Sequence, residues 1–306
     1  MFKISESFSL PVSRQIQKLI RAFAANFQHK MLTMFQLCQV MVMISFSSSI
    51  TLLASDQLHP GEGRLPQELA NLTYVQKIDF TRNYLYGTIP VEWASMKNLS
   101  FISLTANRLS GNIPGHLGSF TALTYLSLES NQFSGVVPPE LGKLVNLKTL
   151  ILSGNKLVGT LPEALAQIKD LKDFRVSDNN LNGTVPEFIG NWTQLQKLDL
   201  YATGLQGPIP LAIFHLEKLS DLRIADMPGP EFQLPNSPIE RQFFDLTFNK
   251  LVGEIPPNTI RRRQFTFLSG NKLTGTVQDS FLQNSPNLDV SYNNFSRSPR
   301  CSSSNE

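Results

Sequence analysis

The stretch that decides the fold is Lys97 to Phe120, which reads KNLSFISLTANRLSGNIPGHLGSF. The next two stretches, Thr121 to Leu144 and Val145 to Ile168, keep the same frame, so the pattern repeats every 24 residues. A fixed period of about 20 to 50 residues is typical of a solenoid, in which each repeat forms one coil and contacts only its neighbours. The sequence therefore predicts a solenoid.

An asparagine marks most of the repeats. A step of 24 residues runs through five of them to Thr203, and a step of 22 residues separates the last three. Each lies where a short strand turns a corner, and we expect its amide to bond backbone groups of its own turn and of the neighbouring coil, which is a structural role. The asparagines are Asn83, Asn107, Asn131, Asn155, Asn179, Asn249, Asn271 and Asn293.

The residues before each asparagine have the alternation of a strand. In Leu123-x-x-Leu126-x-Leu128-x-x-Asn131, the two residues Leu126 and Leu128 have the period of a strand that buries one face. The same period predicts that Tyr125, Ser127 and Glu129 face solvent. Stacked repeats would then form one parallel β-sheet along the concave side.

A second block, L-x-G-x-I-P, follows the asparagine in six consecutive repeats. Glycine allows close approach between coils, and proline, which donates no backbone hydrogen bond, starts the convex turn. The blocks begin at Leu85, Leu109, Phe133, Leu157, Leu181 and Leu205.

This block resembles that of plant leucine-rich-repeat receptor-like kinases. The resemblance covers roughly residues 56–296 and implies a right-handed solenoid with short 3₁₀ or irregular segments on the convex side. The stretches 78–90, 92–96 and 201–210 resemble the subfamily in which a malectin-like domain follows the repeats. The 306 residues contain no malectin-like domain, transmembrane helix or kinase, and no Gly-rich loop followed by a catalytic Asp motif. We therefore expect a truncated ectodomain and no enzyme.

The first 49 residues are interpreted as a leader. Residues 31–55 carry no charge, Val40 to Phe46 is an apolar run, and Ser47 to Ser49 supplies small residues, so 31–49 resembles a secretory signal cleaved after Ser49. Three alternatives stay open: a signal anchor, an organelle transit peptide in which basic residues accompany an amphipathic pattern before Lys30, and a misassigned start.

The repeats divide into a regular part (73–216), a decayed part (217–242) and a less regular part (243–296), followed by a tail (297–306). Residues 228–242 lack the block, and we expect a gap in the core there. Arg263 and Thr266 stand at apolar positions and Gln278 replaces a proline, so the last third should be less stable. The capping cysteine pair of the family is missing, and a first strand near 50–55 would be an exposed edge.

No catalytic, metal or cofactor site is expected. The four histidines, His29, His59, His116 and His215, are scattered, and Cys38 and Cys301 are too few for a four-ligand zinc site and leave the compartment undecided. The formal net charge of +3 arises before residue 56, so no field for nucleic acid is implied. The cluster Arg261 to Arg263 is interpreted as a solvated loop.

A ligand would bind the concave face, because stacking brings the outward strand positions into one surface. These positions carry a mixture of aromatic, apolar and charged side chains, and the charged ones would also be expected on a face that only contacts solvent. The positions are Phe101, Ser103, Tyr125, Glu129, Ile151, Asp173, Arg175, Lys197, Asp199 and Tyr201. Five sequons would permit glycosylation in a secreted chain, although chance would supply several of them: Asn71, Asn98, Asn182, Asn191 and Asn294.

Three interpretations of function remain at this stage. The first is an extracellular or cell-surface recognition scaffold for a peptide, a protein or a cell-wall glycan, with a co-receptor as a further partner. The second is a secreted inhibitor of a cell-wall-degrading enzyme, for which cysteine caps would be expected. The third is a nonfunctional fragment of a receptor gene. The sequence does not identify the ligand, the oligomeric state or the attachment to a membrane.

Overall fold

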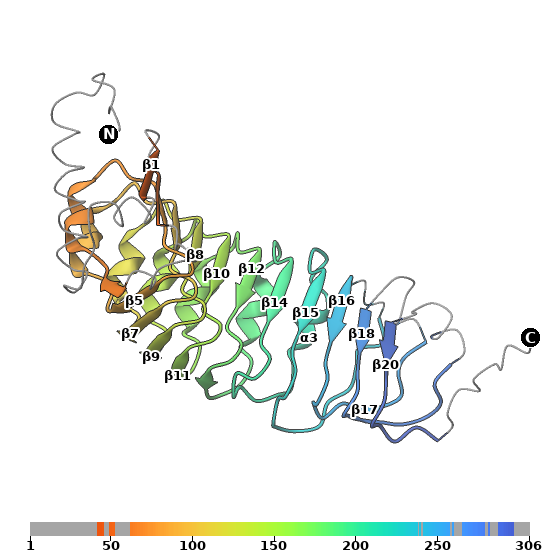
Figure 1. Cartoon of the computed structure of the whole chain (residues 1–306). Coiled ribbons are helices and arrows are strands. Elements are labelled where there is room, and N and C mark those ends of the chain that lie inside the picture. Colours follow the sequence, from red (N-terminus) through yellow and green to blue (C-terminus); the bar gives the residue numbers. More distant parts are fainter. Residues whose placement is uncertain are drawn as a thin grey trace, which may run out of the picture.

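The computed structural model describes residues 42–45, 49–52, 62–237, 239, 241–257, 259, 265–278, 281 and 287–296. These residues form one elongated, curved solenoid in which successive coils stack side by side (Figure 1). The solenoid predicted from the 24-residue period is confirmed.

A long sheet of 12 strands runs along the solenoid, with each coil contributing one strand. Neighbouring strands are parallel, with the exception of the first pair, and the register places equivalent residues of each coil opposite one another, as in Phe101 opposite Tyr125. The strands, in order, are β1 (Val42–Ser45), β2 (Ser49–Leu52), β4 (Lys77–Asp79), β6 (Phe101–Ser103), β8 (Tyr125–Ser127), β10 (Thr149–Ile151), β12 (Asp173–Arg175), β14 (Lys197–Asp199), β15 (Asp221–Arg223), β16 (Phe243–Asp245), β18 (Phe265–Phe267) and β20 (Asn287–Asp289).

A second sheet, which the sequence analysis did not predict, is built by the L-x-G-x-I-P blocks. It has six strands in the order β13-β11-β9-β7-β5-β3, and a further pair joins β17 to β19. Gly111 of this sheet has φ +80°, a conformation that L side chains rarely adopt. The strands are β3 (Glu62–Arg64), β5 (Tyr84–Gly87), β7 (Arg108–Asn112), β9 (Gln132–Gly135), β11 (Lys156–Gly159), β13 (Asn180–Leu181), β17 (Val252–Gly253) and β19 (Lys272–Leu273).

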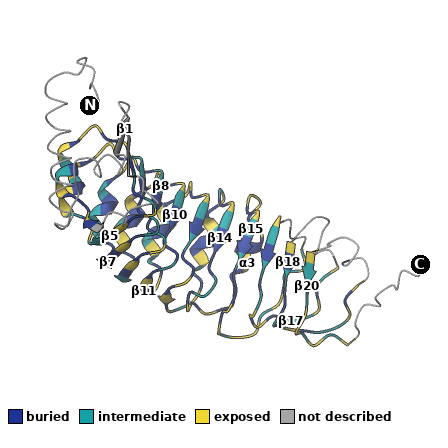
Figure 2. Cartoon of the chain, viewed as in Figure 1, coloured by how far each residue is buried: buried dark blue, intermediate teal, exposed yellow. Residues whose placement is uncertain are grey.

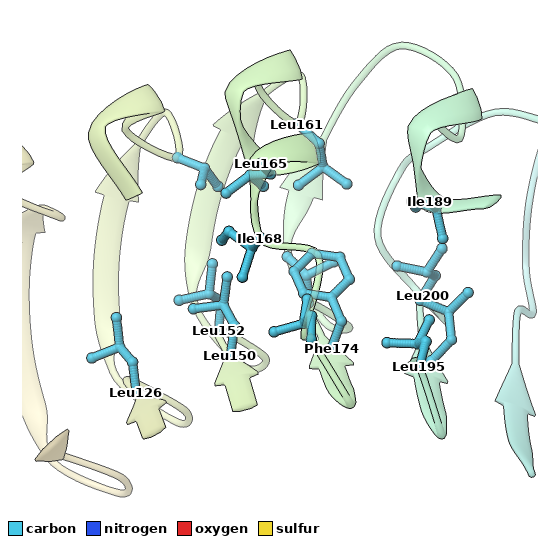
Figure 3. Close-up of a cluster of buried hydrophobic side chains, with 14 of the residues drawn as sticks. Leu126, Leu150, Leu152, Leu161, Leu165, Ile168, Phe174, Ile189, Leu195 and Leu200 are labelled. Carbon is cyan, nitrogen blue, oxygen red and sulfur yellow. The ribbon is translucent and has the colours of Figure 1, made fainter. Parts of the chain in front are cut away.

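Short helices close the coils between residues 67 and 214 opposite the long sheet. Each follows a proline, as at Pro114 before η3, because proline has no N–H to donate and suits the entry to a helical turn. Apolar side chains from the two sides meet in the core, where Leu150 and Phe174 lie across from Leu161 and Leu165 (Figure 3). The helices are η1 (Gln67–Asn71), η2 (Val91–Ser95), η3 (Gly115–Ser119), η4 (Pro139–Lys143), η5 (Glu163–Gln167), η6 (Glu187–Asn191) and α3 (Leu211–Phe214).

The repeated asparagines join neighbouring coils. The Nδ2 atom of Asn131 donates to Leu104 O of the preceding coil at 2.9 Å and to Leu128 O of its own coil at 3.1 Å, while its Oδ1 accepts from Leu109 N at 3.0 Å. Asn107 and Asn155 also donate to these two carbonyls, so Leu109 N is the buried group for which the Asn131 amide is the partner. Asn107, Asn155, Asn249, Asn271 and Asn293 each bond two coils in the same manner.

The predicted gap in the core around residues 228–242 is wrong. Met227, Leu234 and Ile239 are buried in the same cluster as the regular repeats, and β15 pairs with β16 in continuous register. The coil is 22 residues long, from Asp221 to Phe243, and Met227 N donates to Asn249 Oδ1 in place of the leucine of the missing block. The coil is shorter by two residues and remains closed.

The two ends of the solenoid can be compared with the expectations. The strand expected near residues 50–55 is β2 (Ser49–Leu52), which pairs with β4 on one side and antiparallel with β1 on the other. Cleavage after Ser49 would remove β1 and leave β2 at the edge of the sheet. Near the other end, Thr266 is fully buried and its Oγ1 has no hydrogen-bond partner, as a polar residue at an apolar position would suggest. Arg263 lies outside the described residues. In the described part of the chain, no helix is long and apolar enough to cross a membrane.

Candidate functional site

The candidate site is the solvent side of the 12-stranded sheet, here called the long-sheet face. Phe101, Tyr125, Asp173, Arg175 and Lys197 lie on it in neighbouring coils and are partly exposed. Glu129 and Tyr201 follow the strands and are also partly exposed. The structure therefore brings seven of the ten predicted residues to one partly exposed surface. Figure 2 shows buried and intermediate segments along the strands of the long sheet.

The remaining three predicted residues are buried. Ser103 is 4% exposed, Ile151 5% and Asp199 7%, and Ser127, which was expected to face solvent, is fully buried. The alternation rule failed because strands only about 4.8 Å apart let neighbouring side chains cover short ones. The Oγ atom of Ser103 lies 2.7 Å from Thr81 Oγ1, and that of Ser127 lies 2.6 Å from Thr105 Oγ1.

An aromatic pair marks the N-terminal part of the long-sheet face. The rings of Phe101 and Tyr125 stack with centroids 4.3 Å apart and planes 9° from parallel. The ammonium group of Lys77 lies 4.5 Å from the Phe101 ring centroid and 3.5 Å from the carboxylate of Asp79. Phe101 therefore lies between the Tyr125 ring on β8 and the Lys77 ammonium group on β4.

The middle of the long-sheet face is a network of paired charges. Arg175 donates to both carboxylate oxygens of Asp173, and Asp221 accepts from Lys197 at 3.0 Å and from Arg223 at 2.9 Å. Hydrogen bonds to Arg223 and Lys197 outweigh burial and lower the pKa of Asp221. Since these cations are paired, this region presents no free cluster of positive charge.

Asp199 lies beneath this network. Burial raises the pKa of its carboxyl, and the hydrogen bond from Ser177 Oγ, together with Lys197, Arg223 and Arg175, opposes the rise without cancelling it. A buried carboxylate held among cations organises the surrounding side chains more than it offers a contact to a ligand.

A second aromatic cluster, which the sequence analysis missed, lies toward the C-terminus. Phe243 stacks with Phe265 at 6.1 Å between centroids and contacts Phe267 at 5.3 Å, and Phe265 is 45% exposed. Arg223 places its guanidinium carbon 4.0 Å from the Phe243 centroid. Counting back six and four residues from Asn249 and Asn271 would have found these positions, because that spacing gives Tyr125 and Ser127 from Asn131.

The other predicted residues lie elsewhere on the solenoid. The sequon asparagines Asn71, Asn98, Asn182, Asn191 and Asn294 are all exposed. His116 lies in η3 and His215 ends α3, in different coils, and burial lowers the pKa of His116. Among the described residues, no group of three or more His, Cys, Asp or Glu side chains could hold a metal ion.

Comparisons with known proteins agree with this architecture. Residues 105–228 match a family model described as a leucine-rich repeat region. A search of curated proteins found no significant match. The structure is therefore that of a leucine-rich-repeat solenoid.

Several solved structures resemble the chain. The plant peptide hormone receptor RGFR1, solved in complex with RGF2, has 27% identity and a TM-score of 0.70 over 76% of this chain and 38% of the receptor. The PEPR1-AtPEP1 structure has 35% identity and a TM-score of 0.67 over 76% of this chain and 34% of that one. A plant ice-binding protein has 24% identity and a TM-score of 0.63 over 92% and 86%, and this likeness shows the fold alone.

The solved structures that resemble the chain thus include a plant peptide hormone receptor, and the chain spans little more than a third of the length of the RGFR1 and PEPR1 chains. The fold and these neighbours support a ligand-binding scaffold. They do not identify a subfamily with a malectin-like domain.

Proposed function

We propose that this chain is an extracellular recognition scaffold of the receptor-like kinase type, and that its long-sheet face binds an extended peptide. The observation that supports this most is the pair of partly exposed aromatic clusters, Phe101 with Tyr125 and Phe243 with Phe265 and Phe267, separated by a network of paired charges. Aromatic anchors on a rigid surface are typical of protein and peptide recognition. The similarity to RGFR1, a plant peptide hormone receptor solved in complex with RGF2, supports the same proposal.

The ring geometry favours a peptide over a cell-wall glycan. A sugar ring stacks on an open aromatic face, whereas Phe101 lies between Tyr125 and the ammonium group of Lys77. The edges of these rings, and the charged side chains between the two clusters, suit apolar and polar side chains of a peptide better. No specific observation favours the inhibitor of a cell-wall-degrading enzyme.

A displayed library of random 12-residue peptides would test the peptide proposal. The full chain is expected to enrich peptides that lose binding when Tyr125→Asp or Phe265→Asp is introduced and keep it when Val91→Asp is introduced. Val91 is a matched control because it lies in η2, opposite the long sheet, and is 66% exposed. Failure to enrich any peptide, or equal loss with all three variants, would contradict the proposal.

The location outside the cell needs its own test. Mass spectrometry of the protein from plant cell-wall fluid and from membranes should find residues 1–49 removed and a glycan on the exposed Asn98 or Asn182. Recovery of the unprocessed chain would favour the fragment interpretation.

A further inference from the structure

We infer that the C-terminal aromatic cluster, together with Asp245 and Asp289, binds a cationic side chain of the peptide, arginine or lysine. This inference rests on the proposed function, and it adds the chemistry of the ligand at one end of the long-sheet face. The cluster consists of Phe243, Phe265, Phe267, Asp245 and Asp289 and is called the cation cluster below.

The strand register places a carboxylate on each side of an aromatic ring. Asp245 of β16 is opposite Phe267 of β18, which is opposite Asp289 of β20. Strands of a sheet lie about 4.8 Å apart, so the Cα atoms of the two aspartates are about 10 Å apart with the ring between them. A guanidinium or ammonium group over that ring would be within reach of both carboxylates.

Both carboxylates are held in place by the backbone. Asp245 Oδ1 accepts from Thr247 N at 3.0 Å and Thr247 Oγ1 at 2.9 Å, and Asp289 Oδ1 accepts from Ser291 N at 3.0 Å. The hydrogen bond from Ser291 lowers the pKa of Asp289, which keeps it ionised at neutral pH. The two groups are thus oriented before a ligand arrives, which reduces the entropy cost of binding.

The chain itself shows the chemistry at two other places on the same face. Lys77 contacts both the Phe101 ring and the carboxylate of Asp79. Arg223 contacts both the Phe243 ring and the carboxylate of Asp221. In each case one cation is shared by an aromatic ring and an aspartate, a combination in which the ring and the carboxylate attract the same positive charge.

At Phe267 the ring and the carboxylates are present, and the part of the chain that the structure describes supplies no cation to them. Among the described residues, no ion pair reaches Asp245 or Asp289, and no basic side chain lies over Phe265 or Phe267. The outward positions of β16, β18 and β20 carry two carboxylates and no basic residue. Arg223 of β15 is opposite Asp245, but it is paired with Asp221, so the formal charge at the outward positions of β15 to β20 remains −2. A ligand cation would complement this charge.

The inferred partner is therefore a peptide with at least one arginine or lysine. An organic cation fits better than a metal ion, since the described residues hold no group of three metal-ligating side chains and the two carboxylates are separated by a phenyl ring. Cation–π contact together with two carboxylates should make this residue a major contributor to affinity.

The test uses the peptides that the full chain enriches from the 12-residue library, synthesised in two forms. One form keeps its basic residues, and in the other arginine is replaced by citrulline and lysine by norleucine, which removes the charge at similar size. Both forms are titrated against the wild type, against Asp245→Asn/Asp289→Asn, and against the control Asp170→Asn/Glu187→Gln. The control changes the formal charge equally at exposed positions away from the long-sheet face.

We expect the enriched peptides to contain arginine or lysine more often than the starting library. Removing the peptide charge should weaken binding by about tenfold for the wild type and the control, and much less for Asp245→Asn/Asp289→Asn. The asparagine side chains keep an oxygen to accept from Thr247 and Ser291, and thermal unfolding followed by circular dichroism checks that the variant is folded.

The outcomes separate the two proposals. The inferred role of the cation cluster would be wrong if the enriched peptides lacked basic residues, or if removing the peptide charge weakened binding equally for all three proteins. Either result would still be compatible with peptide binding. Enrichment of no peptide at all would overturn the proposed function itself, and the cation cluster with it.

Discussion

Phe101 and Tyr125, which are 24 residues apart in the sequence, stack nearly parallel on neighbouring strands with their ring centroids 4.3 Å apart. A stacked aromatic pair contributes about 1 kcal/mol beyond the burial of its area. A double-mutant cycle with Phe101→Ala and Tyr125→Ala should therefore give a coupling energy of about 1 kcal/mol in urea unfolding. The control cycle of Phe101→Ala with Val91→Ala, on the opposite side of the coil, should give no coupling; a stacked pair with no coupling would contradict the prediction.

Asn131→Ala should be strongly destabilising. The substitution leaves the buried Leu109 N without its side-chain partner and removes one of the two side-chain donors to the carbonyl oxygens of Leu104 and Leu128. We expect a loss of about 2 kcal/mol in the free energy of unfolding. Asn146→Ala is the matched control, because its exposed Nδ2 donates only to Thr121 O, and should cost less than about 1 kcal/mol. Chemical denaturation of both variants measures the difference, and equal losses would show that the ladder contributes little.

Gly118→Ala should disturb the packing between η3 and η4. A Cβ atom at Gly118 would lie 2.2 Å from the backbone oxygen of Glu140, so the two coils would have to move apart, at a cost of about 2 to 3 kcal/mol. Gly115→Ala, in the same 3₁₀ helix, would meet only the flexible side chain of Glu140 and should change stability by less than about 0.5 kcal/mol. Thermal unfolding of both variants tests this prediction, and equal unfolding midpoints for Gly118→Ala and Gly115→Ala would contradict it.

Thr266→Val should stabilise the C-terminal coils. The Oγ1 atom of Thr266 is buried without a hydrogen-bond partner, and replacing the hydroxyl by a methyl group of similar size should raise the free energy of unfolding by about 1 kcal/mol. Thr247→Val, which removes the hydrogen bond to Asp245, should not stabilise. Urea unfolding of both variants tests this, and a destabilised Thr266→Val would show that the hydroxyl has a partner.

The effect of Asp199→Asn on stability should depend on pH. Because burial raises the native pKa of Asp199, the unfolded chain ionises first as the pH rises above about 4, and the wild type loses stability until the pH passes the native pKa. The free energy of unfolding of the variant minus that of the wild type should therefore grow from pH 4 to pH 7.

Asp289→Asn should change the pH dependence of the free energy of unfolding in the opposite direction. The native pKa of Asp289 is lowered, so its contribution to stability is present above the unfolded pKa and is lost as the pH falls through the native pKa. This variant should be less stable than the wild type at pH 7 and approach it in acid. If both variants showed the same trend in pH-dependent unfolding, the assigned directions of the two shifts would be wrong.

The repeat frame predicted most of the fold but less of the site. The frame located the strands of the long sheet, the asparagines and the core positions, because their spacing is imposed by the coil itself, but it did not predict the second sheet. It did not predict the burial of Ser103 and Ser127, which depends on hydroxyl pairs between coils. It also did not anticipate the closed 22-residue coil, because Met227 takes over a hydrogen bond from a position two residues early.

The cation cluster was missed for a different reason. The repeat frame gives the strand positions of Phe243, Asp245 and Phe267. The absence of the L-x-G-x-I-P block nearby, however, predicted a broken solenoid in this region. The stacking of Phe243 with Phe265 and the position of Arg223 depend on the register between coils, which the one-dimensional pattern does not give.

Thr203 interrupts the asparagine ladder, and we therefore expect the solenoid to unfold in two cooperative units. Its Oγ1 accepts from Leu205 N of its own coil at 3.1 Å, and Leu181 N of the preceding coil donates to the Thr203 carbonyl oxygen instead of to an amide. In a linear array, stability depends on the coupling between nearest neighbours, and the weakest coupling sets where partial opening starts. Slow amide exchange should therefore persist up to residue 202 while the coils beyond it, which carry the cation cluster, open first.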